Sequence, residues 1–155
     1  GVVGRGHGYG RPMLIRPFER ADTEPVVTLW ERCGLTRPWN DPRKDIERKL
    51  TVQPELFLVG VDDDVVVGSV MAGYDGHRGW VNYLAVDPGH RRAGLAGRLM
   101  SVVELELRAL GCPKVSLQVR AGNEVALDLY TALGYEPDHT VVLGKRLISD
   151  ETPDR

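Results

Sequence analysis

The sequence predicts a single α+β domain with a mixed, mostly antiparallel β-sheet and helices on both faces. Three consecutive apolar segments joined by short turns predict neighbouring antiparallel strands. A strand, a long helix and another strand then predict a right-handed crossover, which makes one strand pair parallel. The 155 residues suit one domain. We expect it at residues 13–149, between a glycine-rich disordered extension or expression remnant at 1–12 and a flexible tail at 150–155.

The domain is expected to begin with a short apolar strand at residues 13–17, followed by two helices. Apolar residues recur at helical spacing over 22–33, and Gly34 stands where a helix commonly ends. The second helix is expected over 42–52, because Asp41 is a suitable N-cap and a proline fits the first helical turn.

Valine-rich segments predict the next three strands. Residues 56–61 and 65–73 should form a hairpin around the three aspartates at 62–64. Residues 80–86 form the third strand, and the chain leaves the sheet at Pro88, because a proline cannot extend the hydrogen-bonded ladder.

Helices and strands alternate in the second half of the domain. A helix with a buried apolar stripe is expected over 95–110. Residues 114–120 alternate apolar and polar side chains as a strand does, so they and 80–86 should form a central parallel pair. Asn123 is expected to cap the next helix, and a last strand at 141–147 completes the fold.

Composition excludes several classes of protein. The net charge of −2 argues against a broad nucleic-acid footprint, which needs a strongly basic face. Cys33 and Cys112 lack metal-ligand spacing, and no apolar run reaches the length of about 20 residues that a membrane span needs. We therefore expect a cytoplasmic protein with reduced thiols and no bound metal.

The most informative segment is 84–96, in which an apolar strand ends, a turn follows and a helix begins. The first amide N–H groups of that helix have no backbone partner and carry the positive end of its dipole. Gly94 lets an anion approach the backbone closely, and Arg91 and Arg92 add charged donors. This pattern predicts a phosphate-binding turn, although it lacks the Gly-Lys-Ser/Thr of a Mg-nucleotide loop.

Two motifs resemble the signatures of the GNAT superfamily of N-acetyltransferases. The first is Arg91-x-x-Gly94-x-Ala96, which opens a helix after an apolar strand. The second consists of Asn123, Ala126, Leu129, Tyr130, Leu133, Gly134 and Tyr135. The order of elements agrees with that family over 13–147, which implies a GNAT-type domain whose parallel strands splay apart. Further segments resemble the YpeA-like branch of the family, at 37–42, 73–79 and 111–114.

The resemblance implies an acyltransferase that uses acetyl-CoA as cosubstrate. In the family, the pyrophosphate lies on the turn at 91–96, and the pantetheine arm enters where the two parallel strands part. The residues implied in cofactor binding are Leu84, Ala85, Val86, Arg91, Arg92, Ala93, Gly94, Leu95, Ala96, Asn123 and Tyr130. The reaction implied is direct attack of a primary amine on the thioester in a ternary complex.

The chemistry needs a base and an acid. An alkyl ammonium has a pKa of about 10.4, so its proton must be removed before attack. Tyr130 is the candidate general acid for the leaving thiolate, as the resemblance implies. No glutamate lies on the 80–86 strand, where several family members keep one, so the base is left open between Asp75 and His77, with Tyr83 as a further candidate.

The acceptor region implied by the resemblance lies between the two early helices. The candidate acceptor-binding residues are Trp39, Asn40, Asp75, His77 and Tyr83. The acceptor itself is open between a small amine, a lysine side chain and a protein N-terminus, and a homodimer is the default among oligomers. Two alternatives remain: a non-catalytic protein that binds or senses acyl-CoA, and a nucleic-acid module built on Arg91, Arg92 and Arg98.

Overall fold

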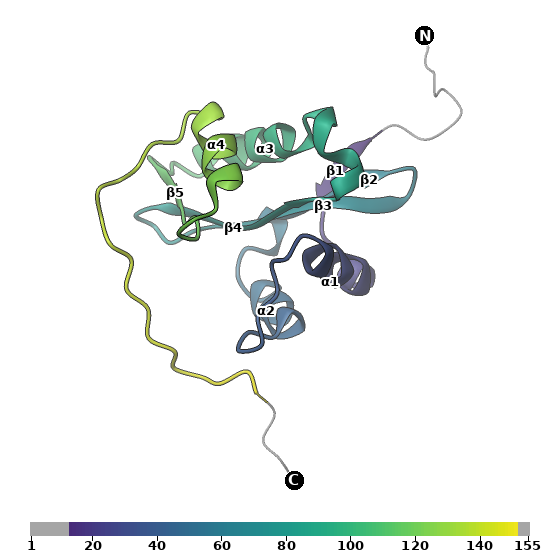
Figure 1. Cartoon of the computed structure of the whole chain (residues 1–155), viewed down its shortest axis with the longest axis horizontal. Coiled ribbons are helices and arrows are strands. Elements are labelled where there is room, and N and C mark those ends of the chain that lie inside the picture. The colour runs from purple at the N-terminus through teal and green to yellow at the C-terminus, as the bar shows by residue number, and fades with distance from the viewer. Residues whose placement is uncertain (1–12, 152–155) are drawn as a thin grey trace.

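The computed structural model describes residues 13–151, in which one five-stranded sheet lies between two layers of helices. Figure 1 shows α1 and α2 on one face of the sheet and α3 and α4 on the other. The strands are β1 (Leu14–Pro17), β2 (Phe57–Asp62), β3 (Val65–Tyr74), β4 (Gly79–Val86) and β5 (Val115–Leu117). The α-helices are α1 (Thr23–Arg32), α2 (Pro42–Lys49), α3 (Leu95–Ala109) and α4 (Glu124–Ala132). Short 3₁₀ helices occur at Arg20–Asp22, Pro54–Leu56 and Pro88–Ala93.

The sheet confirms the predicted mixed topology. Its strand order is β1-β2-β3-β4-β5, with antiparallel pairs from β1 to β4 and a parallel pair between β4 and β5. The last parallel partners are Val81 and Leu117, although β4 continues to Val86. The predicted strand at 114–120 is therefore shorter than expected, and residues 118–120 turn away from β4.

Helix α3 lies very close to the sheet because glycines face it. A Cβ atom at Gly68 would come within 2.7 Å of Leu95 Cδ2, and one at Gly60 within 3.0 Å of Leu95 Cδ1. The apolar stripe predicted for this helix is confirmed at Leu99, Val103 and Leu107, whereas Leu110, expected in the same stripe, is 51% exposed. On the opposite face, α1 buries Val26, Val27, Leu29 and Trp30, and α2 buries Ile46. The two layers fix where β4 ends and α3 begins, which positions the predicted phosphate-binding turn.

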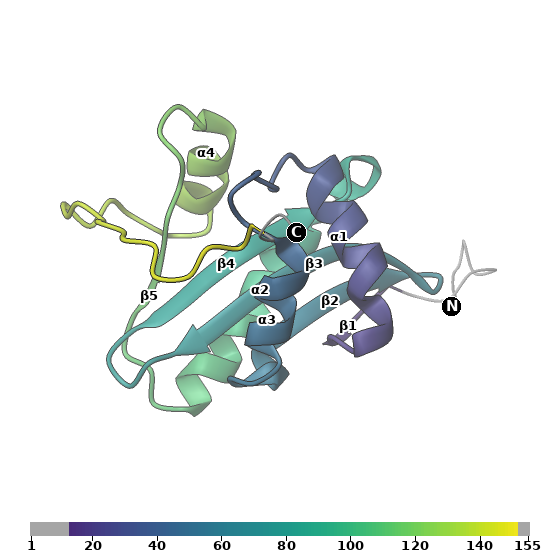
Figure 2. The same cartoon turned by 90° about the horizontal axis from the view of Figure 1, so that it is seen from below.

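The last strand predicted at 141–147 is wrong. Residues 136–151 form no helix or strand, and Figures 1 and 2 show them passing the β5 edge of the sheet toward α2. The apolar residues of this segment stay exposed, with Val141 at 84% and Leu143 at 89%. Since β5 has only three residues, it offers a short template for a further strand. Because no strand of the described residues pairs with the outer side of β5, the parallel pair lies at the edge of the sheet and not at its centre.

A polar contact holds the end of this segment in place. Asp150, expected in a flexible tail, is only 5% exposed and accepts hydrogen bonds from the backbone N–H of Asp41 and from Arg48. The extension predicted at 1–12 and residues 152–155 lie outside the described part of the chain. Within residues 13–151, no helix combines the length and apolar character that crossing a bilayer requires.

Candidate functional site

Between two matched positions of the β3–β4 pair, β4 has one residue more than β3. Ser69 of β3 pairs with Ala85, whereas Met71 pairs with Asn82, so two steps along β3 match three along β4. This extra residue is a β-bulge, which bends a strand and interrupts its ladder. Tyr83, within the bulge, has a φ of 54°, a left-handed conformation that is costly for a side chain of this size. The bulge lies just beyond the point where β4 and β5 stop pairing.

Buried contacts hold the bulge in this strained conformation. The Ser69 hydroxyl is fully buried, donates to the carbonyl oxygen of Tyr83 at 2.8 Å and accepts from Trp30 Nε1 at 2.8 Å. The indole of Trp30 also stacks on the ring of Tyr83, with centroids 3.7 Å apart. Helix α1 therefore fixes the bulge from beneath, through side chains that are far from it in the sequence.

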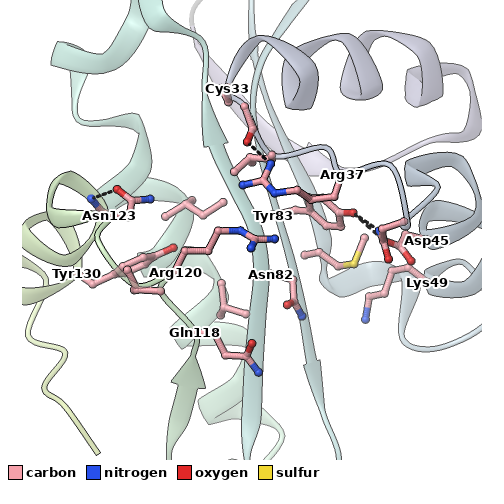
Figure 3. A pocket seen from close by; sticks show the side chains of 18 of the residues that line it. Cys33, Arg37, Asp45, Lys49, Asn82, Tyr83, Gln118, Arg120, Asn123 and Tyr130 are labelled. Carbon is pink, nitrogen blue, oxygen red and sulfur yellow. Dashed lines mark hydrogen bonds between the residues drawn. The ribbon is translucent and has the colours of Figure 1, made fainter. Parts of the chain in front are cut away.

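A cavity of about 890 Å³ opens beside the bulge. Figure 3 shows its walls: the α1–α2 connection and α2 on one side, and the chain after β5 with the start of α4 on the other. Six of the residues expected at the site line it: Trp39, Asn40, Tyr83, Leu84, Asn123 and Tyr130. Residues from six separate segments meet where β4 parts from β5.

Asp75 and His77, the first two candidate bases, lie elsewhere. They belong to the turn between β3 and β4, at the opposite end of β4 from the bulge, and do not line the cavity. Asp75 Oδ1 accepts the backbone N–H groups of Arg78 and His77, both at 2.7 Å. These hydrogen bonds lower the pKa of Asp75, which makes it a weaker base. The expectation that either residue acts as base or binds acceptor has no support from its position.

The predicted phosphate-binding turn is an open helix N-terminus. Gly94 has a φ of 74° and precedes α3, which has no side-chain cap and no acidic residue in its first turn. No atom lies within 4 Å of the place where a Cβ of Gly94 would be. The amide N–H groups of Leu95, Ala96 and Gly97 are at the positive end of the helix dipole. This geometry fits a phosphate group.

The arginine before this turn is folded onto the end of β4. Arg91 Nε donates to the carbonyl oxygen of Val86 at 3.1 Å, and Cys33 Sγ lies 3.4 Å from the same oxygen. The Val86 carbonyl oxygen is therefore engaged by side chains. The side chain of Arg92 lies outside the described part of the chain.

Helix α4 presents two of the expected residues to the cavity. Asn123 caps the helix, since its Oδ1 accepts the backbone N–H of Ala126 at 3.1 Å. Tyr130 turns its hydroxyl toward the cavity in Figure 3, and its ring meets Tyr135 edge to face at 5.9 Å. Burial raises the pKa of Tyr130 to about 12, so the hydroxyl keeps its proton at neutral pH.

The opposite wall carries a carboxylate that sequence reasoning missed. Asp45 Oδ2 accepts hydrogen bonds from the Tyr83 hydroxyl at 2.7 Å and from Asn40 Nδ2. Burial and the neighbouring Asp45 raise the pKa of Tyr83, so Tyr83 is a donor and not a base. In the sequence, Asp45 is one of many charged residues in a short polar helix, and only the packing of α2 over the bulge distinguishes it.

Comparisons with known proteins identify the family of this chain. Residues 18–135 match the profile of the acetyltransferase (GNAT) family. A protein named acetyltransferase from Yersinia enterocolitica is 52% identical over 139 residues, which cover 90% of this chain and 99% of that protein. Another, from Sodalis glossinidius, is 54% identical over 140 residues, which cover 90% of this chain and 99% of that protein.

Solved structures share the fold at lower identity. The aminoglycoside N-acetyltransferase AAC(6')-Iy in complex with CoA has a TM-score of 0.73 at 21% identity, over 88% of this chain and 96% of that one. Ard1 from Thermoplasma volcanium has a TM-score of 0.67 at 24% identity, over 79% and 81%. The chain therefore belongs to the acetyltransferase (GNAT) family, and acetyl-CoA is its cosubstrate.

Proposed function

We propose that this protein transfers the acetyl group of acetyl-CoA to an amine, by direct attack of the amine in a ternary complex. One observation carries the proposal: the cavity opens where β4 separates from β5, and Cys33 Sγ in its wall lies 3.6 Å from Nη2 of Arg91, which shortly precedes the uncapped N-terminus of α3. When bound, acetyl-CoA supplies an activated thioester carbonyl. The amides of residues 95–97 would hold its diphosphate, and the backbone of Leu84, on the edge of β4 that β5 leaves unpaired, would pair with its arm.

The backbone of β4 has a second role in this proposal. Attack on a thioester places negative charge on the carbonyl oxygen, and a fixed backbone N–H is an effective donor to that oxygen. Beyond Val81, the edge of β4 is not paired with β5, so the amide of Leu84 can serve, whereas the backbone of Ala85 pairs with Ser69 of β3. The bulge is fixed by Ser69 and Trp30, which keeps such a donor in place without rearrangement.

Tyr130 is the proposed acid for the departing thiol. Its hydroxyl is directed toward the cavity and stays protonated, because burial raises its pKa to about 12. A hydrogen bond from this hydroxyl stabilises the thiolate as the carbon–sulfur bond breaks, and proton transfer completes release of the thiol. Tyr130 then recovers its proton from solvent.

Asp45 is the proposed proton acceptor. It is the single carboxylate among the cavity-lining residues that the structure describes, and its Oδ2 is hydrogen-bonded to Tyr83. The acceptor ammonium would transfer one proton to Asp45, directly or through the Tyr83 hydroxyl, and the neutral amine would then attack. Asp45 takes the place in the mechanism that Asp75 and His77 cannot fill from the far end of β4.

The neighbouring structures support amine acceptors of more than one size. One contains AAC(6')-Iy with the bisubstrate analogue CoA-S-monomethyl-acetylneamine, and another is the NatC complex bound to Gag peptide and CoA. A thiol-release assay with acetyl-CoA and a panel of small amines, amino acids and peptides tests the proposal. We expect amine-dependent thiol release together with an acetylated product. Saturable acetyl-CoA binding without transfer to any amine would instead indicate a non-catalytic acyl-CoA-binding protein.

A further inference from the structure

We infer that the acceptor carries an acidic group, a carboxylate or a phosphate, in addition to its amine; this inference rests on the proposed acetyl transfer. The inference follows from the charged side chains that line the cavity. Its basic side chains are those of Arg37, Arg48, Lys49 and Arg120. Among the described residues that line the cavity, only Asp45 is acidic. A cavity with this excess of positive charge attracts an anion and repels a polycation.

Most of this positive charge has no carboxylate partner. Arg48 is the exception, since it donates to Asp150 at 2.5 Å and to Asp45 at 3.3 Å. Arg37 donates to the backbone carbonyl oxygens of Gly34 and Thr36, and Lys49 to that of Ala72. Carbonyl groups satisfy the hydrogen bonds of a cation without cancelling its charge.

Arg120 lines the cavity, with its guanidinium unpaired among the residues that the structure describes. Between the described residues, no ion pair or hydrogen bond of its guanidinium is found within the usual distances. Figure 3 shows Arg120 reaching across β4 from the chain after β5, while Arg37 points into the cavity from the opposite wall. Two guanidinium groups that face one cavity repel each other, and an anion between them removes that repulsion. A guanidinium can also bind a carboxylate or phosphate through two parallel hydrogen bonds.

The phosphate-binding turn does not account for these charges. That turn begins α3, on one face of the sheet, and has Arg91 beside it. Arg37 and Lys49 belong to the α1–α2 connection and α2, which cover the other face. The acceptor side of the cavity therefore carries positive charge that is separate from that of the phosphate-binding turn.

The arrangement suits an acceptor with both signs of charge. Asp45 can receive the ammonium group, while Arg120 and Arg37 can receive the acidic group. Amino acids, aminoalkyl phosphates and peptides with an acidic residue near their N-terminus all share this chemistry. A polycationic amine would place additional ammonium groups against Lys49 and the two arginines.

Matched acceptor pairs test the inference. We would measure kcat/KM for an amino acid and its amide, for aminoethyl phosphate and aminoethanol, and for N-terminal peptides with Glu or Gln at the second position, with spermidine as the polycation. We expect the acidic member of at least one pair to be preferred by about tenfold or more, since charge-assisted bonds exceed neutral ones. Preference in the first two pairs indicates a small acceptor, and preference in the peptide pair alone indicates a polypeptide N-terminus.

Variants of Arg120 test whether this residue causes the preference for acidic acceptors. Arg120→Gln should remove it and leave the KM for acetyl-CoA unchanged, whereas Arg120→Lys should keep part of it. Arg43→Gln is the matched control, because Arg43 lies on α2 outside the cavity and pairs with Glu24. Equal use of both members of every pair, a preference for spermidine, or a raised KM for acetyl-CoA in Arg120→Gln would overturn the inference but not the transferase. Absence of transfer to every amine would overturn the proposed function itself.

Discussion

The two ends of β4 differ in how their backbone is paired. At the hairpin end, Gly79 pairs with Tyr74 of β3 and Val115 of β5, and a Cβ on it would lie 2.9 Å from Leu107 Cδ1. At the bulge end, β4 keeps its β3 partners but has none in β5, and a cavity of about 890 Å³ opens there. The same strand therefore supports a closed end that stabilises the sheet and an open end that presents backbone and side chains to a ligand.

This difference explains which sequence candidates reach the site. Tyr83 and Tyr130 were expected there and line the cavity, whereas Asp75 and His77 lie at the closed end. The comparison predicts that substitutions at the bulge end change binding or catalysis, and that matched substitutions at closed positions do not. Four predictions follow this contrast from the largest expected effect to the smallest.

Gly94→Glu is expected to abolish acetyl-CoA binding. The substitution adds bulk and negative charge where the amides of α3 would hold a diphosphate, and like charges repel there. Gly111→Glu is the control, because Gly111 also has a positive φ and open space around its Cβ position but lies at the other end of α3. Calorimetry on both folded variants checks this prediction. Undiminished binding to the Gly94 variant would remove the turn from the cofactor site.

Asp45→Asn is expected to lower kcat by about 10²- to 10⁴-fold, the usual contribution of a general base. The amide keeps the size of the side chain and loses its ability to accept the ammonium proton. Asp75→Asn, at the closed end of β4, should leave kcat within about twofold, because Asp75 only holds its own turn. Steady-state kinetics with the best acceptor decides. The reverse order of effects would restore Asp75 as the base and contradict the contrast between the two ends.

Tyr130→Phe is expected to lower kcat by about 10- to 1,000-fold, with little change in cofactor affinity. The ring and its packing remain, and only the hydroxyl that faces the cavity is lost. Tyr135→Phe is the control, since Tyr135 contacts the same ring but donates its own hydroxyl to Glu104 of α3. Single-turnover rates and calorimetry separate the two effects. A Tyr130 variant with the kcat of the unmodified protein would exclude this residue as the acid.

The smallest predicted effect concerns Asp150, which anchors residues 136–151 to Asp41 and Arg48. Hydrogen bonds from Arg48 and from the Asp41 backbone lower the pKa of Asp150 to about 2. The stability that this carboxylate adds is present above its unfolded pKa of about 3.9 and is lost as the pH falls toward 2. Urea midpoints of the unmodified protein and Asp150→Asn should therefore differ near pH 6 and converge near pH 2. A constant difference across that range would contradict the anchor.

Local patterns in the sequence predicted most of the fold. The periodicity of 95–110, the caps at Asp41 and Asn123, and the crossover that makes β4 and β5 parallel all depend on nearby residues, and the structure confirms them. The strand at 141–147 failed because its pairing depends on a neighbour that is only three residues long. Apolar residues indicate that a segment can form a strand, not that a partner is present.

In the site, too, only the features that depend on nearby residues could be predicted from the sequence. The open turn at Gly94 depends on a short stretch of chain, so glycine and the helix start were enough to locate it. The bulge depends on Trp30, 53 residues before Tyr83 in the sequence, and Asp45 becomes part of the site only when α2 packs over the bulge. No local sequence pattern records such contacts, so Asp45 could not be recognised as a candidate from the sequence.

Titration of the ¹⁵N-labelled protein with CoA, followed through its backbone amide signals, tests the central contrast most directly. We predict the largest shifts at Leu84, Ala85 and the amides of residues 95–97, with little change at residues 75–79. Saturation of these shifts should give one dissociation constant for the strand and the helix start. Large shifts at the hairpin end of β4, with the amides of 95–97 unmoved, would contradict the assignment of the open end as the acetyl-CoA site.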